Sequence, residues 1–434
     1  VRHRDDTIVV PSSHKVDGDD PACIRVDLTR LRRTVNPRAE WRQMFDENGR
    51  LMASHYWRED MNGVDWDGVL NRYRPLVDLC HVVDDLHDIL WETVAELNTS
   101  HSYVSASGAA GDSDMRAGLL GADVSSGDDG ARVVRVIPGE SSDPRAWSPL
   151  RAAGVAVTEG DVIVAVDGRK VGADGNLGEL LEGSAGRVVE LTVRRGENER
   201  QVAVVPMADE APLRYHDWVA SRRRYVEEHS GGRLGYLHVP DMVSDGWAEL
   251  HRQIGEATRH EGVIADVRFN HGGHTSQLVV ERLARRVVGW DYSRWYATAD
   301  TYPQNAVRGP IVMVTNQWAG SDGDIVAAAT QAMGYAKVIG ERSWGGVVGI
   351  DGRFDLVDGT SVTQPRYAGW YGSYGWGVEN HGVDPDIVVT VSPEDWEADR
   401  DVQLDAAIAE CLRQLDDKPA ATAPELPGPA FDRC

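Results

Sequence analysis

Residues 310–329, PIVMVTNQWAGSDGDIVAAA, decide the fold of the largest part of this 434-residue chain. An apolar, β-branched run is followed by a polar turn and an alanine-rich run, which predicts a buried strand, a tight turn and a helix. Ser321 lies in that turn. A serine at a helix N-terminus lies beside unpaired N–H groups that can stabilise a developing oxyanion. Because acidic residues follow it, Ser321 could equally be an ordinary N-cap.

The same alternation of strand and helix extends over residues 210–415. Near-continuous apolar runs occur at 234–239, 262–269, 310–315 and 336–341, and helical patterns lie between them at 247–259, 276–288 and 323–334. Strands buried on both faces have this composition, so we expect an α/β domain with a largely parallel sheet. Functional sites in such sheets lie beyond the carboxyl ends of the strands.

The rest of the chain divides into four further segments. Residues 37–113 read as a helical block, with apolar residues at helical spacing, a cap at Asp84 and Asp85, and a Gly/Ala/Ser linker at 106–113. Residues 114–209 contain the short β-type runs 132–137, 161–166, 188–193 and 201–206. Residues 1–36 are interpreted as a remnant or linker, and the Pro/Ala-rich segment 416–434 as a disordered tail.

Composition excludes several classes of function. The 69 Asp and Glu residues against 45 Lys and Arg give a net charge of -24, which argues against a nucleic-acid partner. With a mean hydropathy of -0.39, the chain has no apolar stretch long enough to span a membrane. The four cysteines are scattered, which favours a reducing, cytoplasmic compartment. Since it begins at Val1, we interpret the chain as a fragment or a processed form.

A second strand-to-turn junction, VRFNHGGH at 267–274, is a candidate oxyanion hole. Adjacent glycines let the backbone come close to a ligand and direct N–H groups toward it. One N–H of Gly272 or Gly273, together with that of Asp322, would supply two donors beside the serine. A turn needed only for topology is the alternative. The H-x-x-H in this stretch has no HExxH motif or well-spaced third ligand to accompany it, so no metal is assigned.

Residues 154–171, GVAVTEGDVIVAVDGRKV, resemble the core signature of bacterial-type PDZ domains. In these domains a Gly-Asp step leads into a buried strand that ends in an Asp-Gly or Asn-Gly hairpin. The resemblance covers about 90 residues. PDZ domains bind a peptide as an added strand and hold its terminal carboxylate in a nest of N–H groups. A β-rich spacer without an open groove is the alternative.

Four segments together resemble the tricorn protease family, a relative of the C-terminal processing proteases. They are LNTSHSY (97–103), DVRFNHGG (266–273), NQWAGSDGD (316–324) and VENHGVDPDI (378–387). The resemblance extends from about residue 37 to 410. It implies a ClpP/crotonase-like core interrupted by a PDZ domain, a serine endopeptidase acting on short peptides without a cofactor, and a homo-oligomer, in this family a hexamer.

The resemblance also implies roles for individual residues. Ser321 is the nucleophile, His101 the general base, and Ser100 links His101 by a hydrogen bond to Glu379. A carboxylate at the end of such a relay orients the imidazole and stabilises the imidazolium. Each residue taken alone reads equally well as a surface or capping residue. The sister class often uses a Ser-Lys dyad, but residues 338–348 contain no lysine, which favours a histidine base.

Substrate recognition is implied less directly. The family places an aspartate in a pocket for a basic or hydrophobic side chain, and the corresponding stretch GWDY at 289–292 makes Asp291 the candidate, with Asp322 second. A desolvated carboxylate would favour Arg or Lys. The aromatic stretch 367–376 would line the same cleft or an oligomer contact. Full-length relatives carry β-propellers that have no counterpart in this sequence, and a non-catalytic, PDZ-type peptide-binding scaffold is the competing interpretation.

Overall fold

The computed structural model describes residues 2–3, 6–9, 24–27, 32, 34–106, 115–172 and 176–426. These form two compact units. The first unit comprises residues 1–97, 103–106 and 352–362, and the second comprises 98–102, 107–351 and 363–434. The expected linker and most of the expected N-terminal remnant lie outside the described residues.

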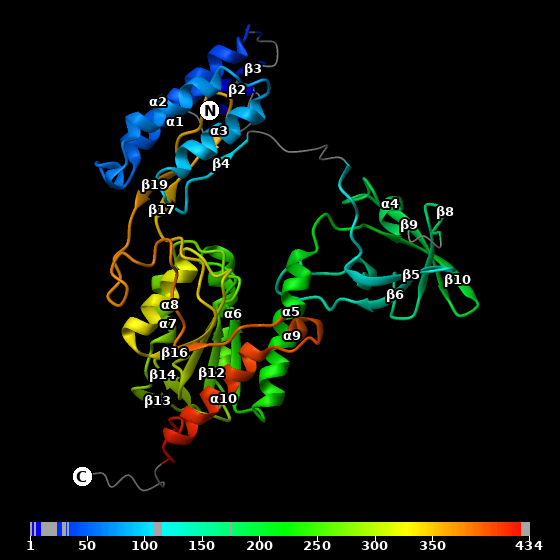
Figure 1. Ribbon diagram of the computed structural model, residues 1–434. Coiled ribbons are helices and arrows are strands. Elements are labelled where there is room, and N and C mark those ends of the chain that lie inside the picture. The colour runs from blue at the N-terminus through cyan, green and yellow to red at the C-terminus, as the bar shows by residue number, and fades with distance from the viewer. Residues whose placement is uncertain are drawn as a thin grey trace. The chain divides into compact units, whose positions relative to one another are not determined.

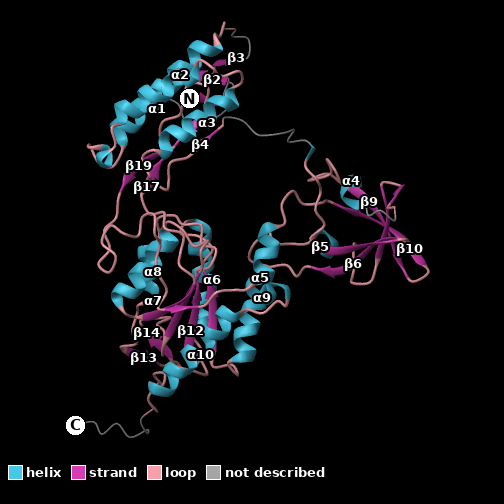
Figure 2. Ribbon diagram, viewed as in Figure 1, coloured by secondary structure: helices cyan, strands magenta, loops and turns pink. Residues whose placement is uncertain are grey.

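The first unit is mainly helical, as predicted (Figures 1 and 2). Its helices are α1 (Pro37–His55), α2 (Trp66–Val77) and α3 (Val83–Ala95), and a short ribbon pairs β4 (Val104–Ser105) with β18 (Ser361–Val362). Three short strands, β1 (Arg2–His3), β2 (Asp6–Val9) and β3 (Ile24–Asp27), form a small sheet. Asp85 accepts hydrogen bonds from the N–H groups of His81 and Val82, so α3 begins before the periodic apolar run.

The PDZ-like part of the second unit is an antiparallel sheet, which confirms the predicted β-rich module. Its strands are β5 (Ala122–Gly127), β6 (Gly130–Val136), β7 (Val162–Val166), β9 (Val189–Arg195) and β10 (Asn198–Val204), with β8 (Arg169–Lys170) beside β7 and the short helix α4 (Leu177–Leu180). Asp167 and Gly168 both have positive φ, 48° and 73°, which the predicted two-residue hairpin requires.

The α/β part contains a parallel five-stranded sheet, also as predicted. The strand order is β11 (Leu234–His238), β12 (Gly262–Asp266), β15 (Ile311–Thr315), β16 (Ala336–Gly340) and β20 (Ile387–Val388). One face packs on α6 (Ser244–Ala257), α7 (Ser276–Leu283) and α8 (Asp322–Met333). The other face packs on α5 (Ala211–His229) and α10 (Val402–Asp417). Burial on both faces explains the continuous apolar strands.

Several smaller elements surround this sheet. They are the hairpin β13 (Gly289–Asp291)/β14 (Asp300–Tyr302), the ribbon β17 (Gly349–Asp351)/β19 (Gln364–Tyr367) and the helix α9 (Pro393–Glu397). Neither α5 nor α10 was predicted from the sequence, and α10 includes Asp416, where the tail was expected to begin. Among the described residues, none of the helices has the length and apolar character needed to cross a membrane.

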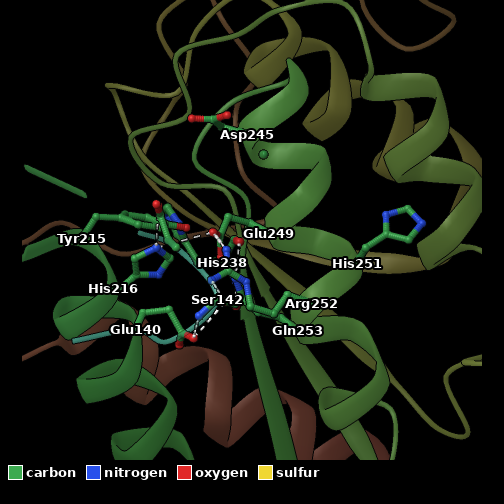
Figure 3. A network of polar contacts seen from close by, with 12 residues as sticks. Glu140, Ser142, Tyr215, His216, His238, Asp245, Glu249, His251, Arg252 and Gln253 are labelled. Atoms are coloured by element: carbon green, nitrogen blue, oxygen red, sulfur yellow. Dashed lines mark hydrogen bonds and ion pairs between the residues drawn. The ribbon is translucent and has the colours of Figure 1, made fainter. Parts of the chain in front are cut away.

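Polar side chains connect the PDZ-like sheet to the α/β part within the second unit. Arg252 of α6 donates a 2.7 Å hydrogen bond to Ser142, and His216 of α5 lies 3.4 Å from the carboxylate of Asp143. Figure 3 shows Ser142 beside Arg252 and Glu249, two residues that also form an ion pair. The loop that follows β6 therefore contacts both helices through a network of charged and hydroxyl groups.

Candidate active site

The turn between β15 and α8 holds Ser321 in a strained backbone conformation. Its φ of 57° and ψ of -119° are rare for a residue with a side chain, and such strain collects at functional sites. The hydroxyl of Ser321 makes no capping hydrogen bond within the described chain, so the ordinary N-cap geometry is not observed. Ser321 thus stands at the helix N-terminus with its hydroxyl available, at the carboxyl edge of the sheet.

The glycine turn after β12 packs directly against this serine. A Cβ atom built on Gly272, where φ is 76°, would lie 2.5 Å from the Cβ of Ser321, so only glycine fits. The N–H of Gly272 donates to the Asn270 side chain at 2.9 Å. This bond occupies the N–H of Gly272. Of the two glycine donors predicted from the sequence, Gly273 is therefore the better candidate for binding an oxyanion. The N–H of Asp322, the first residue of α8, remains the second candidate donor.

The residues Ser100, His101 and Glu379 are joined by hydrogen bonds. The hydroxyl of Ser100 lies 3.1 Å from Nδ1 of His101, and the backbone N–H of Ser100 donates to Oε1 of Glu379 at 2.8 Å. Of these two bonds, the one to the carboxylate thus comes from the main chain of Ser100. Oε2 of Glu379 accepts the N–H groups of Val347 and Val348 at 2.8 and 3.0 Å. Three backbone donors thus fix this carboxylate.

The electrostatics of His101 suit a base. Burial lowers the pKa of His101 below its usual value, and the negative charge of Glu379 raises it in part. The imidazole is therefore neutral at pH 7, and Glu379 is placed to stabilise the charged form when a proton arrives. The backbone carbonyl of His101 accepts a 2.7 Å hydrogen bond from the hydroxyl of Thr363, which fixes the main chain at this position.

Trp344 bridges the histidine and the serine turn, and it was missed in the sequence. Its ring meets that of His101 edge to face, with the centroids 5.4 Å apart. The same ring covers Gly320, where a built Cβ would lie 2.7 Å from Cε3 of the tryptophan. Gly320 immediately precedes Ser321. One indole ring thus contacts both the predicted base and the turn that carries the predicted nucleophile.

The two candidate specificity carboxylates have different surroundings. Asp291 is exposed at the end of β13, opposite Asp300, and none of the contacts found among the described residues joins it to Ser321 or His101. The carboxylate of Asp322 is buried and accepts the N–H of Ser276 at 3.0 Å, where α7 begins. The carboxylate of Asp322 is thus engaged at the start of α7, whereas Asp291 is exposed to solvent.

A cavity of about 760 Å³ opens beside the same strand ends. Aromatic residues in its wall come from several segments: Trp218, Phe269, Trp318 and Trp396. Phe269 follows β12 and Trp318 follows β15, so the cavity adjoins the turns that carry the glycines and Ser321. Within the described parts of the chain, no three His, Cys, Asp or Glu side chains are grouped as metal ligands.

The fold and these turns define the class of protein. A parallel sheet with a strained serine at a helix N-terminus follows an inserted PDZ-like sheet, and residues 233–389 match the model of Peptidase family S41. Residues 118–209 match the tricorn protease PDZ domain, and residues 37–95 match the tricorn protease C1 domain. All three matches follow the predicted order of the chain.

Individual relatives narrow this class. The chain is 59% identical over 424 residues to tricorn protease homolog 1 of Streptomyces coelicolor, covering 96% of this chain and 40% of that protein. It is 38% identical to the tricorn protease of Thermoplasma acidophilum, over 87% of this chain and 35% of that one. A crystal structure of the tricorn protease matches with a TM-score of 0.86 and 36% identity, over 91% of this chain and 38% of that one.

The chain therefore belongs to the tricorn protease family. It spans about two fifths of the length of these relatives.

Proposed function

We propose that this chain is a serine endopeptidase core that hydrolyses peptides through Ser321, His101, Ser100 and Glu379. The observation that carries the proposal is the connected set of hydrogen bonds from Glu379 through Ser100 to Nδ1 of His101. With Nδ1 bonded to Ser100, Nε2 is the nitrogen that would accept the proton of Ser321. This arrangement matches what a hydroxyl nucleophile needs from a base and its orienting carboxylate.

The reaction begins when Ser321 attacks the scissile carbonyl and its proton passes to Nε2 of His101. The resulting imidazolium is stabilised by the charge of Glu379. The N–H groups of Gly273 and Asp322 receive the developing oxyanion, aided by the positive end of the α8 dipole. His101 then protonates the leaving amine, and a water molecule activated by the same histidine releases the acyl group from the serine.

Substrate preference is proposed to depend on Asp291. Its exposed carboxylate would form charge-assisted hydrogen bonds with an Arg or Lys side chain next to the scissile bond. The aromatic cavity beside the strand ends offers apolar surface for neighbouring side chains of a peptide. Short peptides are the proposed substrate class, in keeping with the family.

A homo-oligomer, a hexamer by family resemblance, is the proposed assembly. The exposed side chains of Trp370 and Trp376 support it, since exposed aromatic residues are enriched at protein interfaces. We also propose a reducing, cytoplasmic setting, which suits the two described cysteines, Cys80 and Cys411, both of which are buried free thiols. Light scattering on the purified chain tests the assembly, because a monomer at working concentration would contradict it.

Covalent labelling tests the enzymatic proposal. A fluorophosphonate probe is expected to modify Ser321. Fluorogenic peptides with Arg, Leu or Asp before the scissile bond serve as the substrate panel, and the Arg peptide should be cleaved fastest. Ser321→Ala should lower kcat by about a million-fold. Cleavage that survives this substitution, together with an unlabelled Ser321 in the parent, would refute the assignment of Ser321. A parent that is neither labelled nor active would favour the competing interpretation of a non-catalytic, PDZ-type peptide-binding scaffold.

A further inference from the structure

A second buried carboxylate lies one helical turn beyond the serine. Asp324, on α8, is fully buried and accepts hydrogen bonds from the hydroxyl of Ser343 and from the N–H groups of Gly345 and Gly346, the last two at 2.8 and 3.2 Å. Burial raises the pKa of Asp324, while these donors and the backbone N–H of Ser321 favour its charged form. Three donors from residues 343–346 therefore converge on one carboxylate.

The loop that is hydrogen-bonded to Asp324 is also hydrogen-bonded to Glu379. Residues 343–348 form a loop, and its last two N–H groups are those that bind Oε2 of Glu379. The same loop carries Trp344, whose ring contacts His101. Hydrogen bonds thus join the loop to Asp324 of α8 at one end and to the carboxylate of Glu379 at the other.

The loop is also paired with the turn at 378–383, from which Glu379 projects. Ser343 exchanges hydrogen bonds with Val383, donating its backbone N–H to the carbonyl and accepting the N–H of Val383 with its hydroxyl. The N–H of Asn380 donates to the carbonyl of Gly345 at 2.7 Å. A Cβ on Gly345 would lie 2.5 Å from the N atom of Gly382, so the two segments are in direct backbone contact. A shift of the loop would therefore shift Glu379.

We propose that Asp324 is a positioning residue for the reaction, fixing the 343–348 loop and the Ser321 turn so that Glu379 and Trp344 hold His101 in register with the serine. This inference rests on the proposed peptidase function. An aspartate suits the position because every group around its carboxylate is a donor. An asparagine would set its own NH₂ against one of the backbone N–H groups, which leaves buried donors unpaired.

The alternative is that Asp324 merely stabilises the first turn of α8, as acidic residues do at helix N-termini. That role would lower thermal stability without changing kcat, and its effect would be independent of Glu379. A double-mutant cycle separates the two, because residues that act through one another have non-additive effects.

The experiment compares Asp324→Asn, Glu379→Gln and the double variant with the parent. Asp324→Asn should lower kcat by about a hundred-fold, the loss expected from a small misplacement of catalytic groups, with KM changed less than about two-fold. The double variant should be no slower than the slower single variant by more than about three-fold. The matched control is Asp161→Asn, another buried aspartate, which is ion-paired with Arg195 in the PDZ-like sheet. Its kcat should stay near that of the parent.

A second variant and a second readout cover the case in which Asp324→Asn folds poorly. Ser343→Ala keeps the carboxylate and removes the hydroxyl between Asp324 and Val383, so a smaller loss of kcat, about ten-fold, is expected. Amide hydrogen exchange in peptides covering 343–348 and 378–383 should be faster in both variants and unchanged in Asp161→Asn. This readout does not need activity, so it tests whether Asp324 fixes the loop even if the parent cleaves nothing.

The outcomes are distinct. An inactive, unlabelled parent contradicts the proposed function, while exchange still reports whether Asp324 fixes the loop. An active parent with additive losses in the cycle, or with exchange in 343–348 unaltered by Asp324→Asn, overturns the positioning role.

Discussion

Replacing Glu379 with glutamine changes one charge while keeping the shape of the side chain. In the folded protein, Oε1 accepts the N–H of Ser100 and Oε2 accepts those of Val347 and Val348. An amide can satisfy only one of these two sides, because its NH₂ faces N–H groups on the other. The variant thus removes the negative charge that stabilises the imidazolium in the proposed mechanism, and it also disturbs the hydrogen bond to Ser100.

The charge effect can be estimated from the geometry. Two hydrogen bonds and the Ser100 main chain separate the carboxylate from the imidazole, so a separation of about 7 Å and an effective dielectric constant near 20 give about 2.4 kcal/mol. This corresponds to a loss of about fifty-fold in kcat/KM. Because the charge of Glu379 raises the pKa of His101, its removal should lower that pKa further and move the acid limb of the kcat/KM profile to lower pH.

Steady-state cleavage of a fluorogenic peptide between pH 4 and 9 provides the assay. The control is Asp384→Asn, a half-exposed carboxylate near the same turn that pairs with Arg342 and His381. Exposed pairs contribute little, so this control should retain parental kcat within about two-fold. An unchanged kcat/KM in Glu379→Gln, or an acid limb that moves to higher pH, would refute the assignment of Glu379 as the carboxylate that supports His101.

Two further substitutions test the walls of the site. Gly272→Ala should lower kcat by at least about a hundred-fold and reduce the free energy of unfolding by about 1–3 kcal/mol, because the new methyl group would meet the Cβ of Ser321 at a residue with positive φ. Steady-state kinetics measures the first effect and chemical denaturation the second. A variant that is both active and stable would contradict the close packing of Gly272 on Ser321. Asp291→Asn should selectively weaken cleavage after Arg. An equal loss with Leu substrates would show that Asp291 does not select the substrate side chain next to the scissile bond.

Local patterns were sufficient to predict the strands and the turns of the α/β part. The run 310–315 predicts β15 because a strand buried on both faces is apolar throughout. The Gly-Ser-Asp-Gly stretch, followed by an alanine-rich run, predicts a turn that leads into a helix. Helix α5 was missed because its segment, APLRYHDWVASRRRYVEEH, is rich in charged and aromatic residues and shows a weak apolar period. The predicted helix at 276–288 is shorter in the structure, where α7 ends at Leu283.

The predicted site depends on contacts that no local pattern contains. Trp344 belongs to a loop that returns to α8 only after β16, and Asp324 is hydrogen-bonded to the same loop. Neither residue could therefore be recognised from its spacing in the sequence. The bond from Ser100 to Glu379 also depends on the backbone direction at 100, which determines whether the N–H or the hydroxyl meets the carboxylate. The identities of the predicted residues came from family resemblance, and their roles stay predictions.

The backbone strain at Ser321 lowers the stability of the fold at the position of the proposed nucleophile. A residue with a side chain in this conformation costs about 1–3 kcal/mol, whereas glycine adopts positive φ without that penalty. Selection for thermal stability alone would therefore favour glycine at the position of the proposed nucleophile. A chain that keeps serine here is therefore less stable than one with glycine, and we expect selection to keep the serine only while its hydroxyl has a function.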